Sequence, residues 1–367
     1  MTRVWLSAGE PSGDLHAAAL VPALREAIPD LHLAAMGGPH LAAAGARIAE
    51  PAERLGSRGL VEVFRDLPAH VAALRRVRTA IGARRYDLVI LVDYPGFHLR
   101  VARAAHGAGI PVLYYIAPQL WAWGAWRTRA VRRSVSRMAV ILPFEEAFFR
   151  GAGVPAAFVG HPLLDRARPS RLEARRALGL DARTPVLALL PGSRPHDVER
   201  HWAVFRATAR RVLDELPGGH VLLACVDGQA YPGADDVVAA SGPSSLVLAA
   251  ADVALCKSGT VTLEAALAGT PLVVAYRHHP VTHAVAKRAV RVAHVGLVNL
   301  VAERPVAPEF LQRGASPERL VRALLPLFDR EGRAATQQRE GLARVCARLG
   351  TPGAARRVAA FARELVA

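Results

Sequence analysis

Short apolar runs alternate with longer amphipathic segments from one end of the chain to the other. The run 87–92 is continuously apolar after its first residue, which is typical of a strand buried on both faces of a parallel sheet. The alternation of such strands with helices predicts an α/β fold. The predicted strands are 3–8, 31–36, 87–92, 111–116, 138–142, 186–190, 220–224, one near Leu246, 252–255 and 272–275; the predicted helices are 14–27, 67–84, 201–216 and the C-terminal segment, which is broken at Pro352-Gly353.

The pattern is interrupted once, around Gly160-His161-Pro162, and resumes with the strand 186–190. A chain of 367 residues has room for two domains of about 100–200 residues each. We therefore expect two facing Rossmann-like domains with the active site in the cleft between them, because ligands bind beyond the carboxyl ends of parallel strands. The predicted division is an N-terminal domain 1–165, a C-terminal domain 166–345 and a final helix 346–367 that packs back toward the N-terminal domain.

Composition narrows the class of protein further. Three scattered cysteines, Cys225, Cys256 and Cys346, form neither a disulfide framework nor a zinc motif, so we expect reduced thiols and no bound metal or cofactor. The N-terminus lacks the layout of a secretory signal, and no apolar run reaches the ~18 residues of a membrane span. These features predict a cytoplasmic protein.

The chain is strongly basic, with a formal net charge of +16. Lys257 and Lys287 are the only lysines among 47 basic residues, so arginine supplies nearly all of the positive charge. A coding bias toward arginine explains this as well as attraction to nucleic acid, a phosphorylated substrate or an anionic membrane does. Charge alone does not separate these explanations.

The first predicted strand runs into a glycine-containing turn, residues 7–16. Such a turn before a helix lets backbone amides approach an anion, but it also reads as a plain turn capped by Ser12 or Asp14. The segment is not GxGxxG, which disfavours a dehydrogenase. The candidate cleft residues here are Glu10, Ser12, Gly13, Asp14 and His16.

Asp93 follows the buried strand 87–92 directly and therefore lies at the carboxyl edge of the sheet. A carboxylate at this edge can accept a proton from an attacking hydroxyl as a general base. An Asp before Tyr94-Pro95-Gly96 is also common in turns, so the residues alone leave both interpretations open.

The second half of the chain carries two strand ends suited to phosphate. Gly192-Ser193-Arg194 follows one strand, and the guanidinium can pair with a phosphate. Ser258-Gly259-Thr260 lies between a strand and a helix, where free amides and the helix dipole favour a diphosphate. Glu264 is one turn further on the same helix face and can accept both ribose hydroxyls. The alternative is a capped helix with an ordinary first-turn glutamate.

Two segments combine apolar and basic residues. Trp121, Trp123 and Trp126 lie among four arginines, a pattern that suits a membrane interface or an acyl chain. The helix 67–84 carries Leu67, Val71, Leu74 and Ile81 with Arg75, Arg76, Arg78 and Arg84. For this helix, packing into the core with solvated arginines explains the pattern slightly better.

Taken together and in order, these motifs resemble the lipid-A-disaccharide synthase family. The resemblance spans nearly the whole chain, and the ordered set is far more specific than any one motif. The matching stretches are AGEPSGDLH (8–16), MGGPHLAAAG (36–45), GLVEVFRDLP (59–68), YIAPQLWAWGAWR (115–127), LPFEEAFF (142–149), FVGHPLLD (158–165), LALLPGSR (187–194), SGTVTLEAAL (258–267), PLVVAYR (271–277), AKR (286–288) and NLVAERPVAPEFLQ (299–312).

The resemblance implies a metal-independent, inverting glycosyltransferase of the GT-B type. Such an enzyme moves 2,3-diacylglucosamine from UDP to 2,3-diacylglucosamine 1-phosphate, forms a β-1,6 bond and releases UDP at the cytoplasmic face of the inner membrane. It implies Asp93 as the base with Glu10 nearby, and Arg194 and 258–260 as the residues that stabilise UDP. Glu264 would hold the ribose, Asn299 would belong to the donor site, and a homodimer is possible.

The chain departs from the family at two places. Where the family usually reads Pro-Asp-Phe-Asn, this chain has Pro95-Gly96-Phe97-His98, and Ser-Leu-Pro-Asn-Leu is replaced by 296–300, which keeps Asn299. These changes concern the predicted handling of the acceptor more than the predicted binding of UDP. The alternatives are a UDP-N-acetylglucosamine epimerase, the N-acetylglucosaminyl transferase of peptidoglycan synthesis, and a non-catalytic polyanion-binding protein; nucleic-acid motifs are absent.

Overall fold

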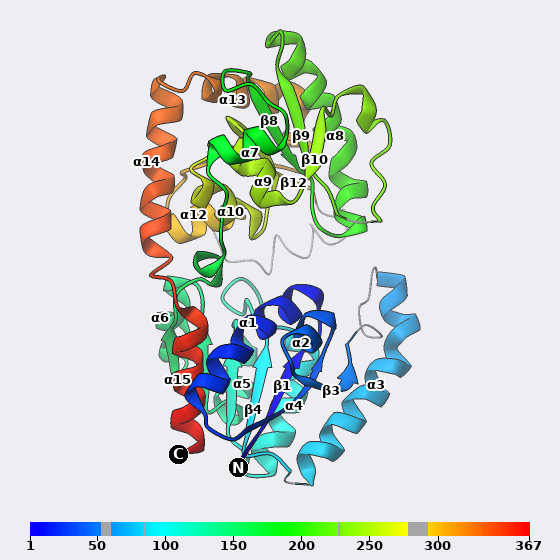
Figure 1. Cartoon of the computed structure of the whole chain (residues 1–367), viewed down its shortest axis with the longest axis vertical. Coiled ribbons are helices and arrows are strands. Elements are labelled where there is room, and N and C mark those ends of the chain that lie inside the picture. Colours follow the sequence, from blue (N-terminus) through cyan, green and yellow to red (C-terminus); the bar gives the residue numbers. More distant parts are fainter. Residues whose placement is uncertain (53–59, 84, 227, 278–292) are drawn as a thin grey trace. The chain divides into compact units, whose positions relative to one another are not determined.

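The computed structural model describes residues 1–52, 60–83, 85–226, 228–277 and 293–367, with the side chains of 60–67 outside that description (Figure 1). The chain forms two compact units. Unit 1 contains Met1–Asp165 and Leu349–Ala367, and unit 2 contains Arg166–Arg348. Each unit is built on one parallel sheet with helices packed against it.

Unit 1 has a seven-stranded sheet in the order β3-β2-β1-β4-β5-β6-β7. Its central strand β4 has the sequence LVILV, and all five residues are buried. Val89 and Leu91 face one core cluster, whereas Leu88, Ile90 and Val92 face the other, as the two-residue period of a strand requires. The strands are β1 (Thr2–Ala8), β2 (Leu31–Gly37), β3 (Arg47–Pro51), β4 (Leu88–Val92), β5 (Val112–Tyr115), β6 (Arg137–Val140) and β7 (Ala156–Phe158).

Helices cover both faces of this sheet. One core contains residues of α3, α4, α5 and α6, and the other contains residues of α1, α2 and α15. The C-terminal helix α15 packs beside α1, and Asp165 accepts hydrogen bonds from the first amides of α15 (Figure 1). The helices are α1 (Pro11–Ala27), α2 (Pro39–Ala43), α3 (Leu60–Gly82), α4 (Pro95–Gly107), α5 (Thr128–Ser134), α6 (Pro143–Gly151) and α15 (Ala354–Val366).

Unit 2 has a six-stranded sheet in the order β10-β9-β8-β11-β12-β13. Its strands are β8 (Val186–Leu190), β9 (His220–Ala224), β10 (Ala240–Gly242), β11 (Val253–Lys257), β12 (Leu272–Tyr276) and β13 (Glu309–Leu311). Its helices are α7 (Arg171–Ala177), α8 (Pro195–Glu215), α9 (Ser244–Ala250), α10 (Val261–Ala268), α12 (Leu297–Ala302), α13 (Pro317–Phe328) and α14 (Arg333–Arg348). None of the helices within the described residues is both long and apolar enough to cross a bilayer.

The strand predicted near Leu246 is wrong, because this segment is helix α9. Val247 to Ala250 are consecutively buried, and a short run that is apolar on every side cannot be assigned by periodicity. Three helices also begin earlier than predicted, α3 at Leu60, α1 at Pro11 and α8 at Pro195. In α1 and α8 the reason is that proline suits the first turn of a helix. Neither Ser12 nor Asp14 caps α1, since the N-cap residue is Glu10 and makes no side-chain capping bond.

Candidate functional site

Each sheet has one point where the strand order reverses, and the predicted motifs lie there. In unit 1 the chain moves outward from β1 through β2 and β3, then returns to place β4 on the other side of β1. In unit 2, β8 and β11 stand in the same relation. Loops that diverge from two neighbouring parallel strands leave a crevice at their carboxyl ends. The residues after β1 and β4, and after β8 and β11, are therefore brought together within their own units.

The turn at Asp93 has an uncommon backbone conformation. Asp93 and the following Tyr94 have φ values of +51° and +52°, a left-handed region that non-glycine residues rarely occupy twice in succession. The amide of Asp93 donates to the carbonyl of Tyr115 at 3.0 Å, and the hydroxyl of Tyr114 donates to the carbonyl of Asp93 at 2.6 Å. Strained residues held in this way are typical of functional sites.

His98 supports the same turn from the interior of unit 1. Its side chain is fully buried, with Nδ1 lying 2.7 Å from the Asp93 carbonyl and Nε2 lying 2.9 Å from the Ser7 hydroxyl. Burial lowers the pKa of His98 to about 4, so the ring is neutral at neutral pH. A carbonyl only accepts, so Nδ1–H donates to Asp93 and Nε2 accepts from Ser7. His98, which stands where the family usually has Asn, thus holds the Asp93 turn in place. Sequence reasoning missed this role.

Tyr94 connects this turn to the loop after β1. A Cβ atom on Gly9 would lie 2.1 Å from the Tyr94 ring, so only glycine permits this contact. The Tyr94 hydroxyl lies 2.7 Å from His70 Nε2. Burial raises the pKa of Tyr94 to about 12, and the charge of Glu10 adds to the rise. Glu10 and Asp93 are therefore presented by neighbouring loops at the reversal point of unit 1.

Asp14 has a different position from the one expected of a cleft residue. Its buried carboxylate accepts hydrogen bonds from the amides of Gly38, at 2.7 Å, and His40, at 2.9 Å. It therefore holds the turn between β2 and α2. Of the other candidates here, Gly13 is buried, Ser12 is exposed and His16 is half-buried.

The tryptophan cluster divides into two kinds of residue. Trp121 is half-buried, packs edge-on against Phe144 and donates a 3.0 Å hydrogen bond to buried Glu145. Burial raises the pKa of Glu145 to about 7, the Trp121 hydrogen bond opposes this rise, and the charge of Asp93 adds to it. Trp123 and Trp126 are instead 52% and 78% exposed. Only these last two present an apolar surface to solvent.

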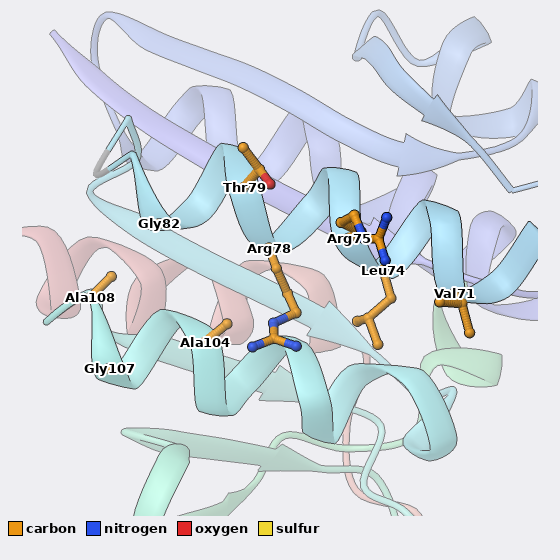
Figure 2. Close-up of a pocket in the computed structure, with 9 residues that line it drawn as sticks. All are labelled: Val71, Leu74, Arg75, Arg78, Thr79, Gly82, Ala104, Gly107 and Ala108. Atoms are coloured by element: carbon orange, nitrogen blue, oxygen red, sulfur yellow. The ribbon is translucent and has the colours of Figure 1, made fainter.

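A groove of about 670 Å³ lies between α3 and α4 in unit 1 (Figure 2). Leu74 and Arg78 project from α3 toward α4. Ile81 of the predicted apolar stripe is buried and Val71 is 50% exposed, so the stripe serves partly as core. The Leu67 side chain, Arg84 and the motif at 286–288 lie outside the described residues. The groove is lined by Val71, Leu74, Arg75, Arg78, Thr79, Gly82, Ala104, Gly107 and Ala108.

In unit 2 the loop after β8 lies directly on the first turn of α8. Gly192 has φ +136°, and a Cβ there would lie 2.4 Å from the Cβ of Asp197. Exposed Ser193 and Arg194 follow, and Arg194 is the N-cap residue of α8 without a side-chain capping bond. The Asp197 carboxylate pairs at 2.9 Å with Lys257, the last residue of β11, which sequence reasoning did not single out.

The loop after β11 leaves the start of α10 accessible. Ser258 donates its hydroxyl hydrogen to the Val295 carbonyl at 2.6 Å, and Thr260 is the N-cap residue of α10. Gly259 has φ +149°, and apart from its chain neighbours no atom of the described residues lies within 4 Å of where its Cβ would be. Glu264 is half-buried and accepts a 2.5 Å hydrogen bond from Ser244. Open backbone amides at a helix start are suited to an anion.

The side-chain amide of Asn299 forms all of its hydrogen bonds with other groups of the protein. It is fully buried, and its Nδ2 donates to the Ala307 carbonyl and to Glu309, each at 2.8 Å. Its Oδ1 accepts from the amides of Val306 and Ala307 at 2.7 and 2.9 Å. Glu309 in turn accepts from the amides of Val295 and Gly296. Asn299 thus helps to hold the segment that contacts Ser258.

Comparison with known proteins gives one family over nearly the full length. Residues 4–352 match the family model described as lipid-A-disaccharide synthetase. The lipid-A-disaccharide synthase of Syntrophus aciditrophicus is 41% identical over 374 aligned residues, which cover 99% of this chain and 97% of that protein.

Two solved structures share the fold. The Staphylococcus aureus MnaA structure with UDP has a TM-score of 0.66 at 14% identity, covering 98% of this chain and 95% of that one. The glycosyltransferase of kitacinnamycin has a TM-score of 0.63 at 19% identity, covering 99% and 98%. At these identities the likeness concerns the fold alone, and it confirms the prediction of two Rossmann-like domains of the GT-B type. The match in sequence, by contrast, is extensive enough to state that the chain belongs to the lipid-A-disaccharide synthase family of glycosyltransferases.

Proposed function

We propose that this chain transfers 2,3-diacylglucosamine from its UDP derivative to 2,3-diacylglucosamine 1-phosphate, with inversion at the anomeric carbon. The products are a β-1,6-linked disaccharide 1-phosphate and UDP, in the biosynthesis of lipid A. Family membership supports the reaction class. The observation that carries the proposal is the strained turn that presents Asp93 at the reversal point of the unit 1 sheet.

Asp93 acts as the general base in this proposal. The oxygen of the acceptor 6-hydroxyl attacks the anomeric carbon while Asp93 takes its proton. The bond from that carbon to the β-phosphate oxygen breaks, and its electron pair leaves with UDP. The half-exposed position of Asp93 supports this role, because a base must reach substrate. Glu10, from the neighbouring loop, borders the same position.

Unit 2 binds the UDP of the donor in this proposal. Arg194 pairs with the diphosphate, together with the backbone of Gly192, Ser193 and residues 258–260. These groups stabilise the negative charge that grows on the departing UDP. The half-buried Glu264 accepts from the ribose hydroxyls. The hydrogen bonds of Asn299 go to the protein itself, which supports an indirect role in UDP binding: Asn299 shapes the loop beside Ser258.

The membrane side of the proposal rests on Trp123 and Trp126. Both rings are largely exposed, Arg127 lies over the Trp123 ring at 5.9 Å, and Arg129 is exposed nearby. Aromatic rings beside arginines suit the headgroup region of an anionic membrane. We propose peripheral association with the cytoplasmic face of the inner membrane through this segment. A homodimer stays a prediction.

The deciding experiment is mass spectrometry of the product formed from the two acylated substrates by the wild-type chain, Asp93→Asn and Asp235→Asn. Asp235 is an exposed carboxylate in unit 2 and serves as the matched control. We expect a disaccharide 1-phosphate from the wild type and the control, and almost none from Asp93→Asn, which should still bind UDP. Full turnover by Asp93→Asn would remove Asp93 as the base.

The same assay separates the alternatives. Epimerised UDP-N-acetylglucosamine, or transfer to an unacylated acceptor in preference to the acylated one, would indicate another enzyme of this fold. DNA binding that falls steeply with salt, with no product, would indicate a polyanion-binding protein instead.

A further inference from the structure

One ion pair lies at the reversal point of the unit 2 sheet and has no part in the roles proposed above. Lys257 ends β11, Asp197 lies in the first turn of α8, and their charged atoms are 2.9 Å apart. Both side chains are largely buried, with 17% and 6% exposed. Within the described residues, Asp197 is the only hydrogen-bond partner of the Lys257 ammonium group. An ammonium group has three N–H donors, so two of them have no acceptor there.

The surroundings of this pair are rich in positive charge. His201 stacks on Tyr276 with ring centroids 5.7 Å apart. Burial lowers the pKa of His201 to about 4, which Asp197 opposes and Lys257 and Arg277 reinforce. Burial raises the pKa of Tyr276, Asp197 adds to the rise, and two further cations, Arg200 and Arg194, oppose it. Four cations thus act on these two rings, whereas Asp197 is the one carboxylate that acts on both, so the cluster carries an excess of positive charge.

Two further features indicate that this charge faces a ligand. The Nε of Arg277 is buried and has no hydrogen-bond partner among the described residues. Lys257 immediately precedes Ser258 and Gly259, and none of the described residues fills the space beside Gly259. The packing of Gly192 on Asp197 brings the loop after β8 to the same ion pair. Buried cations and unpaired donors beside an open helix start require an anion for their full satisfaction.

We propose that Lys257 is a direct ligand of the UDP diphosphate, held in position by Asp197. This inference rests on the proposed function and adds a residue to it. Asp197 takes one N–H of the ammonium and fixes its place, and the remaining two donate to phosphate oxygens. A cation fixed before the substrate arrives loses little entropy on binding. It also stabilises the charge that UDP gains when the glycosidic bond breaks.

Calorimetric titration of the full chain with UDP and with uridine tests this assignment. Lys257→Met should weaken UDP binding roughly ten- to hundredfold, the range for lost hydrogen bonds to charged groups, and leave uridine binding unchanged. Lys257→Arg, which keeps the charge, should restore most of the affinity. Arg211→Met is the matched control: it removes one cation about 21 Å along α8 from Asp197, and that arginine is paired with Glu318.

Asp197→Asn distinguishes a ligand role from a structural one. It keeps an acceptor for Lys257 and removes the one negative charge of the cluster, so UDP should bind at least as tightly as to the wild type. Equal losses of UDP affinity in Lys257→Met and Asp197→Asn, or equal losses for UDP and uridine, would mean that the pair only supports the fold. Unchanged UDP affinity in Lys257→Met would also overturn the inference. A wild-type chain that binds neither ligand would instead refute the proposed function.

Discussion

Replacement of His98 by alanine tests whether the Asp93 turn depends on its buried support. The change removes the hydrogen bond to the Asp93 carbonyl and leaves the buried Ser7 hydroxyl without its partner. Each lost bond costs about 1 kcal/mol, and an unsatisfied buried group costs about 1–3 kcal/mol. The free energy of unfolding of unit 1 should therefore fall by roughly 3–5 kcal/mol. The Tyr114 hydroxyl still holds the same carbonyl, so the turn should loosen without being lost.

The functional consequence should appear in kcat. Misplacement of a reacting group by about 1 Å can cost up to about a hundredfold in rate, so His98→Ala should lower kcat by about that factor. KM for the UDP donor should stay unchanged, because unit 2 binds UDP in our proposal. UDP release gives kcat and KM, and urea unfolding gives the stability. His98→Asn, which restores the usual residue of the family, should keep more of both.

The reasoning would be refuted by a His98→Ala variant with wild-type kcat and wild-type stability. A loss confined to donor KM would refute it as well, since the contact of His98 is with the Asp93 backbone.

Three further predictions concern a buried amide, a buried carboxyl group and two exposed aromatic rings. Asn299→Ala removes four hydrogen bonds and should destabilise unit 2 by roughly 3–5 kcal/mol in urea unfolding; loss of activity with unchanged stability would instead indicate direct contact with substrate. The pKa of Glu145 is raised from 4.5 to about 7, so its stabilising effect is complete below pH 4.5 and is lost as pH rises through 7. The stability advantage of the wild type over Glu145→Gln should accordingly shrink by roughly 3 kcal/mol across that interval, and a constant difference would contradict the raised pKa. Joint replacement of Trp123 and Trp126 by serine should reduce sedimentation with anionic vesicles and leave the melting temperature unchanged, whereas a large drop in melting temperature would place both rings in the core.

Local pattern was sufficient for most of the fold and for the position of the proposed site along the chain. Strand β4 could be predicted because five consecutive apolar residues are buried on both faces of the sheet. Asp93 and Arg194 could be located because the loop that follows a parallel strand begins at its carboxyl edge whatever the strand order. Helix α9 was missed because the five consecutive apolar residues 246–250 show no periodicity.

The sequence by itself therefore determined the α/β class, the family and the loops that we propose carry the chemistry. Only the tertiary structure decided what each polar side chain faces. The motifs predict Asp14 and Asn299 as residues that face the substrate. In the structure, both side chains accept hydrogen bonds from backbone amides instead. His98 meets Ser7 across 91 residues and Lys257 meets Asp197 across 60. Such contacts depend on which strands become neighbours, and strand order results from packing of the whole sheet, which no local pattern encodes.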